Sequence, residues 1–298
     1  MAKPLRLAFT ADLHYGVRAS GDEAIRQLVE FLLKDPPDVL VIAGDIGAGK
    51  DFVRCLSLFK DLRCQKALVP GNHDIWVEDN DSRGDSLQVY SDYLPRASTE
   101  NGFAYLDRHP LLLQEHGLAL VGSINWYDYS WSLEALKAAD EYWEERLRSK
   151  RFTRGRHNDA RFVRWPLDDA TFTRQAVGQL EKHLAPSAGS VDRAIVVTHH
   201  PAFYGLNFPR PEAPRSVDAL LWDAFSGNQA MEDMLRRWEH FVPFVFCGHT
   251  HRQRESFLSS IHGFNIGGDY HFKRLIALDW PSGDSAAHVF GDPEVGSS

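Results

Sequence analysis

Five short polar motifs recur along this chain, and each directly follows a run of apolar residues that favours a buried β-strand. In chain order they are Asp12-Leu13-His14, Gly44-Asp45, Gly71-Asn72-His73-Asp74, His199-His200 and Gly248-His249-Thr250-His251. Buried strands separated by helices form parallel sheets, in which the carboxyl ends of the strands meet at one edge. The motifs are therefore expected to converge, although a long stretch of chain separates the first from the last.

The pattern of apolar residues predicts an α/β fold that begins with a βαβαβ unit. Residues 5–10, 39–43 and 67–69 are short apolar runs of the buried-strand type. Residues 21–34 instead repeat apolar side chains at helical spacing, and Asp51 is expected to cap a second helix. Because helices separate these strands, we expect parallel pairing with right-handed crossovers.

The middle and the end of the chain predict hairpins and an insertion. Residues 111–123 contain two apolar runs that turn at His116-Gly117. Residues 126–190 carry two helical patterns around a basic, glycine-containing stretch, and we expect this segment to be an insertion that partly covers the sheet. Two later runs, 257–267 and 274–279, predict antiparallel strands that complete a second sheet.

The same motifs decide the expected number of domains, because side chains from Asp12 to His251 must meet in one place. A chain of 298 residues fits one large or two average domains. Convergence of the motifs favours a single domain over residues 1–290. Residues 291–298 are expected to form a flexible tail.

The composition argues against long nucleic acid as a partner and against a membrane location. The formal net charge is −8, whereas proteins that grip DNA usually carry a basic field. A basic strip between Lys150 and Arg164 is the exception, and a solvated loop is its favoured interpretation. The three cysteines form no disulfide framework, and no apolar stretch is long enough to span a bilayer. We therefore expect a cytoplasmic protein.

The motifs supply carboxylate, amide and imidazole groups and no thiolate. The candidate metal ligands are Asp12, His14, Asp45, Asn72, His199, His249 and His251. Such a set suits Mn²⁺, iron, Zn²⁺ or Co²⁺ better than Ca²⁺. Successive side chains at a strand end point to opposite faces, so His199 is preferred over His200 as a ligand. Asp45, flanked by glycine, is the expected bridge between two cations about 3.5–4 Å apart.

A pair of cations beside a histidine would suit the hydrolysis of a phosphoester. Two cations acidify a shared water, and the resulting bridging hydroxide can attack phosphorus while both ions offset charge on the phosphoryl oxygens. We expect His73 to protonate the departing oxygen, oriented by Asp45 or Asp74. Taken alone, each motif could be a turn or a helix cap; taken together, the motifs favour a metal centre.

The motifs DLH, GD, GNHD, HHP and GHTH, in this order and at these intervals, resemble those of the calcineurin-like metallophosphoesterase family. The resemblance implies a four-layer α/β/β/α sandwich of two mixed sheets that meet at a dinuclear metal site. It implies one cation held by Asp12, His14, Asp45 and His251, and a second held by Asp45, Asn72, His199 and His249. His73 corresponds to the family's catalytic histidine. The implied cofactors are two divalent or mixed-valence ions, with Mn²⁺ first and iron or zinc as alternatives.

Departures from particular branches of the family narrow the expected function. Protein Ser/Thr phosphatases carry GDxVDRG and GNHE, whereas this chain has GDIGAGK and GNHD, which also disfavours the symmetrical dinucleoside tetraphosphatases. No segment resembles the DNA-gripping domain of the double-strand-break nuclease branch. We expect hydrolysis of a small phosphodiester or phosphomonoester. The alternatives are a nuclease that uses the basic strip on single-stranded nucleic acid, and a non-catalytic, metal-containing module that binds a protein partner.

Residues close to the motifs are candidates for contact with the substrate: Trp76, Trp126, Tyr127, Tyr204 and Arg252. The aromatic rings could stack on a base or pack against a leaving group, or they could pack beneath the insertion. Arg252, directly after the last expected ligand, could pair with a phosphate oxygen or cap its loop.

Overall fold

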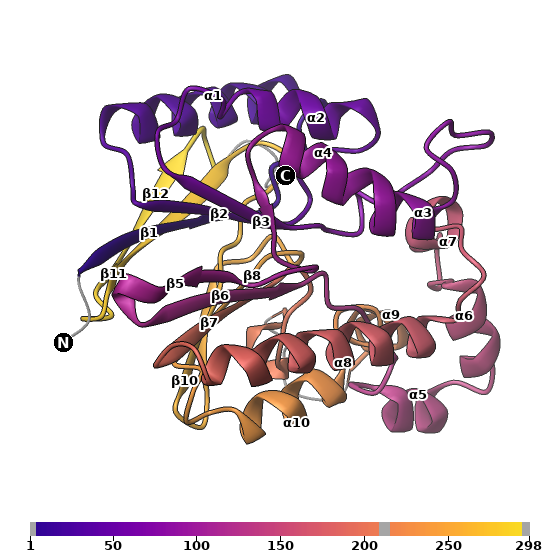
Figure 1. Cartoon of the computed structure of the whole chain (residues 1–298). Helices are drawn as coiled ribbons and strands as arrows, with labels where there is room; N and C mark the ends of the chain where they lie inside the picture. Colours follow the sequence, from indigo (N-terminus) through magenta and orange to yellow (C-terminus); the bar gives the residue numbers. More distant parts are fainter. Residues whose placement is uncertain (1–3, 209–214, 294–298) are drawn as a thin grey trace.

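The computed structural model describes residues 4–208 and 215–293, whose strands form two mixed sheets (Figure 1). The first sheet contains, in spatial order, β12 (Ser285–Phe290), β11 (Lys273–Trp280), β1 (Leu5–Thr10), β2 (Val39–Ala43), β3 (Gln65–Val69) and β4 (Ala104–Tyr105). The second contains β5 (Leu111–Leu113), β6 (Leu118–Ser123), β7 (Arg193–Thr198), β8 (Phe244–Cys247), β10 (Ile261–Asn265) and β9 (Arg254–Leu258).

Helices cover the outer face of each sheet, so the expected four-layer α/β/β/α sandwich is confirmed (Figure 1). The first sheet is covered by α1 (Ala19–Lys34), α2 (Lys50–Ser57) and α4 (Leu94–Glu100), and the second by α8 (Asp169–Ala188) and α10 (Gln229–Arg237). The other α-helices are α3 (Ser86–Gln88), α5 (Leu133–Ala139), α6 (Trp143–Ser149), α7 (Asp159–Phe162) and α9 (Val217–Ala224). Within the described ranges, no helix is both long enough and apolar enough to cross a bilayer.

The core lies in three layers, one between the sheets and one beneath each layer of helices. Between the sheets, Phe9 of β1 stacks on Phe246 of β8 with ring centroids 3.7 Å apart. On the outer side of the first sheet, α1 buries Ile25 and Leu28, as its apolar spacing predicts. Strands such as β2 are buried on both faces, which explains their continuous apolar sequence.

Parallel pairing brings the loops that carry the motifs to one edge of the sandwich. In the first sheet β1, β2 and β3 are parallel neighbours, and in the second sheet β7 and β8 are parallel neighbours. The backbone N–H of His249, after β8, donates to Asp12, after β1, so the carboxyl ends of the five strands lie on the same side of the sandwich.

Of three local predictions, the structure confirms one and contradicts two. The hairpin over 111–123 is present, with Gly117 in a left-handed turn at φ 60°. The run 274–279, however, lies in β11, which pairs antiparallel with β1 in the first sheet and not in the second. Helix α2 begins at Lys50 after Gly49, so Asp51 lies in its first turn and is not its cap.

The segment predicted as an insertion, 126–190, has two parts. Helix α8 packs against β6 and β7 and belongs to the outer helical layer. Helices α5, α6 and α7 instead lie beyond one end of the sheets, beside α3 and α9 (Figure 1). Most of the predicted flexible tail, 291–298, lies outside the described residues.

Candidate metal centre and active-site cavity

The expected ligands occupy turns with an unusual backbone. The angle φ is 55° at Asp12, 45° at His14, 52° at Asp45, 73° at His249 and 56° at His251. Among the described residues, ten residues other than glycine have positive φ, so half of them belong to this set. Such residues cost of order 1–3 kcal/mol each and cluster at functional sites. The strained turns aim these side chains toward a common centre.

Two motif glycines are required because backbone and side chains approach closely at this centre. A Cβ on Gly44, whose φ is 85°, would lie 2.4 Å from Nδ1 of His199. A Cβ on Gly71 would lie 2.1 Å from Oδ1 of Asp45. Neither position can accept a larger residue without displacing an expected ligand.

The first group of candidate ligands is Asp12, His14, Asp45 and His251, whose donor atoms lie within 4.8 Å of one another. The Nε2 atoms of His14 and His251 are 2.9 Å apart, and Nε2 of His14 is 3.6 Å from Oδ2 of Asp45. Oδ1 of Asp12 accepts from the backbone N–H of His249 at 2.9 Å. Its Oδ2 is buried and has no hydrogen-bond partner among the described residues.

The second group contains His199 and His249, with Asn72 beside them. Nε2 of His199 lies 3.1 Å from Oδ1 of Asn72 and 3.4 Å from Oδ1 of Asp45. Nδ1 of His199 lies 3.0 Å from the carbonyl of Ala43, and a hydrogen bond there leaves Nε2 free to bind a cation. The structure brings His200 into this group as well, with its ring centroid 4.0 Å from that of His249.

These distances fit cations held by nitrogen and oxygen donors. Atoms that lie about 2.1 Å from one ion are about 3 Å apart when they subtend a right angle. The separations of 2.9–3.6 Å within the two groups are of this size. The unpartnered oxygen of Asp12 and the facing imidazole nitrogens of His14 and His251 would each gain a partner.

The protonation of three of the four candidate histidines also suits metal binding. Burial lowers the pKa of His14 and His249, and lowers that of His251 to about 4. These rings are therefore neutral at neutral pH, as ligands must be. Burial acts in the same direction on His199, but Asp45 outweighs it and raises the pKa of His199 to about 9. A bound cation would have to displace that proton. Burial raises the pKa of Asp12 to about 7.

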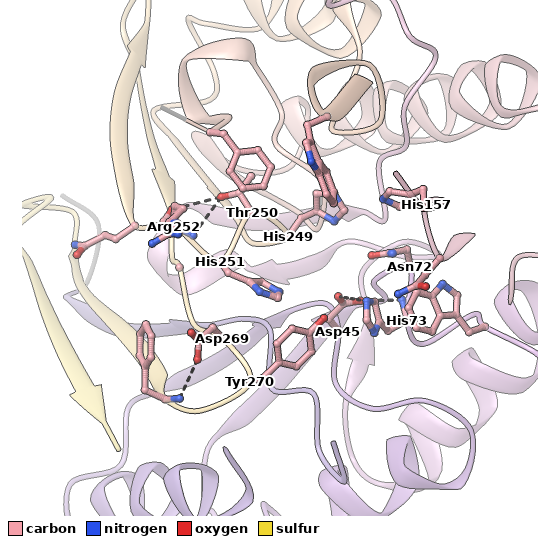
Figure 2. A pocket seen from close by; sticks show the side chains of 18 of the residues that line it. Asp45, Asn72, His73, His157, His249, Thr250, His251, Arg252, Asp269 and Tyr270 are labelled. Carbon is pink, nitrogen blue, oxygen red and sulfur yellow. Dashed lines mark hydrogen bonds and ion pairs between the residues drawn. The ribbon is translucent and has the colours of Figure 1, made fainter. Parts of the chain in front are cut away.

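A cavity of about 950 Å³ opens from this centre, and its lining joins both sheets to the segment around α7 (Figure 2). Asp45, Asn72 and His73 line one part of it, and His249 and His251 line another. Figure 2 shows His251, Tyr270, Asp45 and His73 around one space, although they come from loops of different strands.

The structure corrects the role expected for Asp74. We expected its carboxylate to help orient His73, but Oδ1 accepts from the backbone N–H groups of Ile46 and Gly47, and Oδ2 accepts from that of Gly71. Asp74 therefore joins the turns after β2 and β3, and among the described residues no hydrogen bond connects its carboxylate to His73. Such a fully buried carboxylate satisfies backbone donors that would otherwise have no partner.

His73 is held by other groups. Its backbone N–H donates to Oδ1 of Asp45 at 2.9 Å, and its ring stacks on Trp76 with centroids 3.6 Å apart. Nε2 of His73 lies 3.8 Å from Oδ2 of Asp45, and the side chain is 16 % exposed. The ring therefore has a fixed position beside the ligands and an open side toward the cavity.

Asp159, from the basic stretch, lies at the site although it is not among the residues predicted from the sequence. Oδ1 accepts from Nδ2 of Asn72 at 2.9 Å and from Nε1 of Trp76 at 2.8 Å, and Oδ2 accepts from the hydroxyl of Tyr127 at 2.9 Å. The first of these bonds fixes the amide of Asn72 with its oxygen toward His199. The other candidates were predicted because they directly follow a buried strand. Asp159 does not follow a strand, so this criterion does not predict it.

Tyr270 is a second residue near the candidate ligands that was not predicted from the sequence. Its ring lies 4.5 Å from that of His14 and 5.0 Å from that of His251, and it lines the cavity. A signal was present, because Tyr270 lies in a polar, glycine-containing stretch shortly after the buried strand β10. This is the same pattern that marks the five motifs.

The candidates for substrate contact divide into two groups. Trp76 and Arg252 line the cavity, as expected. Trp126 and Tyr127 are fully buried, and Nε1 of Trp126 donates to Asp169 beneath the insertion. They cannot reach a substrate, so the alternative of core packing is correct for both. Tyr204 is hydrogen-bonded to Asp223 and is not part of the cavity lining that the described residues form.

Replacing Asp159 with asparagine is expected to lower metal affinity by about ten- to a hundredfold, because residues that orient a ligand have effects of this size. The measurement is a titration of the apoprotein with metal, in which calorimetry reports the affinity. Asp169→Asn is the matched control, since Asp169 also accepts from an indole N–H but does not contact Asn72. Equal affinities in both variants and the unmodified protein would contradict this role for Asp159.

The carboxylate of Asp159 should also make the free energy of unfolding depend on pH in the acid range. Burial acts to raise the pKa of Asp159, but His157, Lys150 and hydrogen bonds outweigh it and lower the pKa to about 2. Because the folded pKa lies below the unfolded value of about 3.9, Asp159 stabilises the fold above about pH 4, and that contribution is lost as pH falls toward 2. Asp159→Asn should therefore cost about 2 kcal/mol of unfolding free energy at neutral pH and less at pH 3. Urea denaturation of apoprotein at both pH values measures this; an equal cost at both would count against it.

The sequence profile described as calcineurin-like phosphoesterase matches residues 5–253 of the chain. The chain belongs to the calcineurin-like phosphoesterase family. The match covers all five motifs and confirms the resemblance found in the sequence. As a family member, this calcineurin-like phosphoesterase catalyses metal-dependent hydrolysis of phosphoesters, and its Asp and His side chains form two groups that could bind metal.

Solved structures agree with this calcineurin-like phosphoesterase in fold. A phosphopantetheinyl hydrolase from Mycobacterium tuberculosis is 19% identical with a TM-score of 0.68, and each chain covers 89% of the other. A dimetal phosphatase from Danio rerio is 14% identical with a TM-score of 0.56; the alignment covers 96% of this chain and 99% of that one. At these identities the likeness shows the fold alone. No curated protein matched the sequence.

Proposed function

We propose that this family member is a dinuclear metal-dependent hydrolase of small phosphomonoesters or phosphodiesters. The observation that carries the proposal is the position of Asp45 between the two groups of ligands. Its Oδ2 lies 3.6 Å from Nε2 of His14, and its Oδ1 lies 3.4 Å from Nε2 of His199. Each oxygen therefore faces a different group, which is the arrangement of a bridging carboxylate.

The two groups divide the remaining ligands. Asp12, His14 and His251 would complete one site with Asp45, and Asn72, His199 and His249 would complete the other. The donor set suits Mn²⁺ first, with iron or zinc as alternatives. When bound, the two ions supply an acidified water as nucleophile and offset charge on the phosphoryl oxygens.

His73 is the proposed proton donor to the departing oxygen, positioned by Trp76 and Asp45. Burial lowers the pKa of His73, although Asp45 and Asp159 act in the opposite direction. An anionic phosphoryl group beside the ring would raise that pKa again, so the protonated form would be favoured when substrate is bound. Arg252, which is exposed and lines the cavity, is the proposed partner for a phosphate oxygen.

The size of the cavity supports a small substrate. Its volume of about 950 Å³ lies within the usual range for small-molecule sites. The net charge of −8 favours a small ester over long nucleic acid. A cytoplasmic location stays a prediction from the sequence.

The test is an assay of Mn²⁺-loaded protein on p-nitrophenyl phosphate and bis-p-nitrophenyl phosphate, with elemental analysis of the same sample. We expect about two metal ions per chain and turnover that chelators abolish. Metal uptake without turnover on a broad panel of phosphoesters would instead favour a non-catalytic module that binds a protein partner. Turnover that survives complete metal removal would contradict the proposal.

Single-stranded nucleic acid is the second candidate substrate, because Arg154 and Arg156 of the basic strip line the cavity. Endonucleolytic cleavage of a labelled oligonucleotide, with a steep loss of binding as salt rises, would support this candidate. Hydrolysis of small esters with no detectable cleavage of the oligonucleotide would exclude it.

A further inference from the structure

The cavity is larger than the metal centre needs, and its lining carries more cationic than anionic side chains. Four arginines line it: Arg154, Arg156, Arg252 and Arg274. The carboxylates in the lining are Asp45, which belongs to the candidate metal centre, and Asp269. The carboxylate of Asp269 already accepts from the backbone N–H groups of His271 and Phe272. Positive charge therefore exceeds negative charge in the cavity lining, even without the metal ions.

The side chains of Arg154 and Arg156 are not used to stabilise the part of the fold that the structure describes. Both are exposed, and among the described residues neither side chain takes part in a hydrogen bond or an ion pair. Arg274 differs, because it hydrogen-bonds to Gln253. Two guanidinium groups that line a cavity without internal partners are available to an anionic ligand.

The turn that carries these arginines is fixed to the rest of the protein. Arg151 and Arg156 pair as an isolated bridge, and the N–H of Phe152 donates to the carbonyl of Gly155 at 3.2 Å. The N–H of Thr153 donates to Oδ1 of Asp218 at 2.7 Å. This turn, residues 151–156, thus presents Arg154 and Arg156 from a defined backbone, unlike a freely moving basic loop.

An apolar surface accompanies the two arginines. Phe152 of the turn is 9% exposed, and its ring lies 4.7 Å from that of Trp222, which is 39% exposed. Both rings line the cavity. An organic group of the substrate could pack on these rings while its anionic end meets the guanidinium groups.

We propose that Arg154 and Arg156 bind a second phosphate of the substrate, distinct from the phosphoryl group that is hydrolysed at the metal centre. The inference deepens the proposed function and rests on it. The substrate class is a small organic ester with two separate phosphate groups, whose organic part packs against Phe152 and Trp222. The geometry of the guanidinium fork suits the two oxygens of a phosphate.

The experiment uses a matched pair of substrates, thymidine 5′-(p-nitrophenyl phosphate) with and without a 3′-phosphate. Both release the same leaving group, so their kcat/KM ratio reports the effect of the second phosphate alone. We expect Mn²⁺-loaded protein to prefer the 3′-phosphorylated ester by about ten- to a hundredfold. In the double variant Arg154→Ala, Arg156→Ala, this ratio should fall toward one, chiefly through KM.

Arg151→Ala is the matched control. It removes one positive charge from the same turn, but Arg151 does not line the cavity. We expect this variant to retain the substrate preference. An equal loss of preference in Arg151→Ala would mean that general charge, and not a binding site, produces it, and would overturn the inference.

A second measurement separates this inference from the proposed function. Calorimetry compares binding of adenosine 3′,5′-bisphosphate with binding of adenosine 5′-monophosphate, and needs no turnover. If hydrolysis fails but the bisphosphate binds more tightly in an arginine-dependent way, the proposed function fails and the site stands. If p-nitrophenyl phosphate is hydrolysed but neither measurement shows a preference, the inference is wrong. Loss of oligonucleotide binding alone in the double variant would assign the arginines to nucleic acid, which also overturns it.

Discussion

Replacing Asp45 with asparagine is expected to abolish phosphoester hydrolysis and to reduce the metal content of the protein. If Asp45 lies between two cations, its loss removes a ligand from both and the charge that lowers their mutual repulsion. Loss of this electrostatic stabilisation is worth several kcal/mol, which corresponds to a fall in kcat/KM of about 10³-fold or more. The measurements are steady-state kinetics and elemental analysis of the same preparation. Asparagine tolerates the positive φ of 52° at this position, so the fold should survive.

Asp107→Asn is the control for this prediction. Asp107 is also a buried aspartate, and its Oδ2 accepts from the backbone N–H of Ile124 at 2.6 Å, but it does not line the cavity. Burial raises the pKa of Asp107 to about 7. Because this folded pKa exceeds the unfolded value of about 3.9, ionised Asp107 costs stability as pH rises through the interval between them. The neutral Asp107→Asn variant should therefore fold normally. Because Asp107 does not line the cavity, the variant should also keep its metal content and activity. A fully active Asp45→Asn variant with normal metal content would disprove the bridging role.

The proximity of the candidate ligands could be predicted because a simple geometric rule governs it. Strands β1, β2, β3, β7 and β8 are each buried and each pair with a parallel neighbour, so residues directly after them meet at one edge. Asp12, Asp45 and His249 each follow such a strand by only a few residues. The apolar pattern of each strand and the order of the motifs were therefore enough to predict that the seven candidate ligands lie close together.

The rule fails where a side chain's position depends on tertiary packing. Trp126 follows β6 as directly as the ligands follow their strands, yet its ring is buried against Trp165 and Phe172. Asp159 is the opposite case. It follows no strand in the sequence, but the chain folds back and places its carboxylate against Asn72. Neither outcome is encoded in the residues adjacent in sequence.

The assignment of strands to sheets has the same limit. The pattern of 274–279 predicts a strand correctly, but the residues of a strand do not determine which other strand it pairs with. Leu275 pairs with Thr10 of β1, at the opposite end of the chain. That long-range pairing places β11 and β12 in the first sheet, and only the three-dimensional structure reveals it.

Replacing His73 with alanine is expected to slow hydrolysis by an amount that depends on the leaving group. A positioned proton donor contributes about 10²- to 10⁴-fold when the departing oxygen is a strong base. An alkyl phosphoester should therefore lose activity over this range, whereas a p-nitrophenyl ester, whose phenolate departs readily, should lose much less. The measurement is kcat for both esters, with release of phosphate or alcohol as the readout.

Metal content and the choice of control make the test of His73 specific. His73 is not among the donor groups that the described residues form for a metal, so elemental analysis of His73→Ala should match the unmodified protein. His240→Ala, which removes an exposed histidine, should leave both esters unaffected. Equal losses on the two esters would point to a role in binding or charge stabilisation and against proton donation. A loss of metal would make His73 a ligand, because an imidazole stacked on Trp76 and 3.8 Å from Oδ2 of Asp45 is close enough to turn toward a cation there.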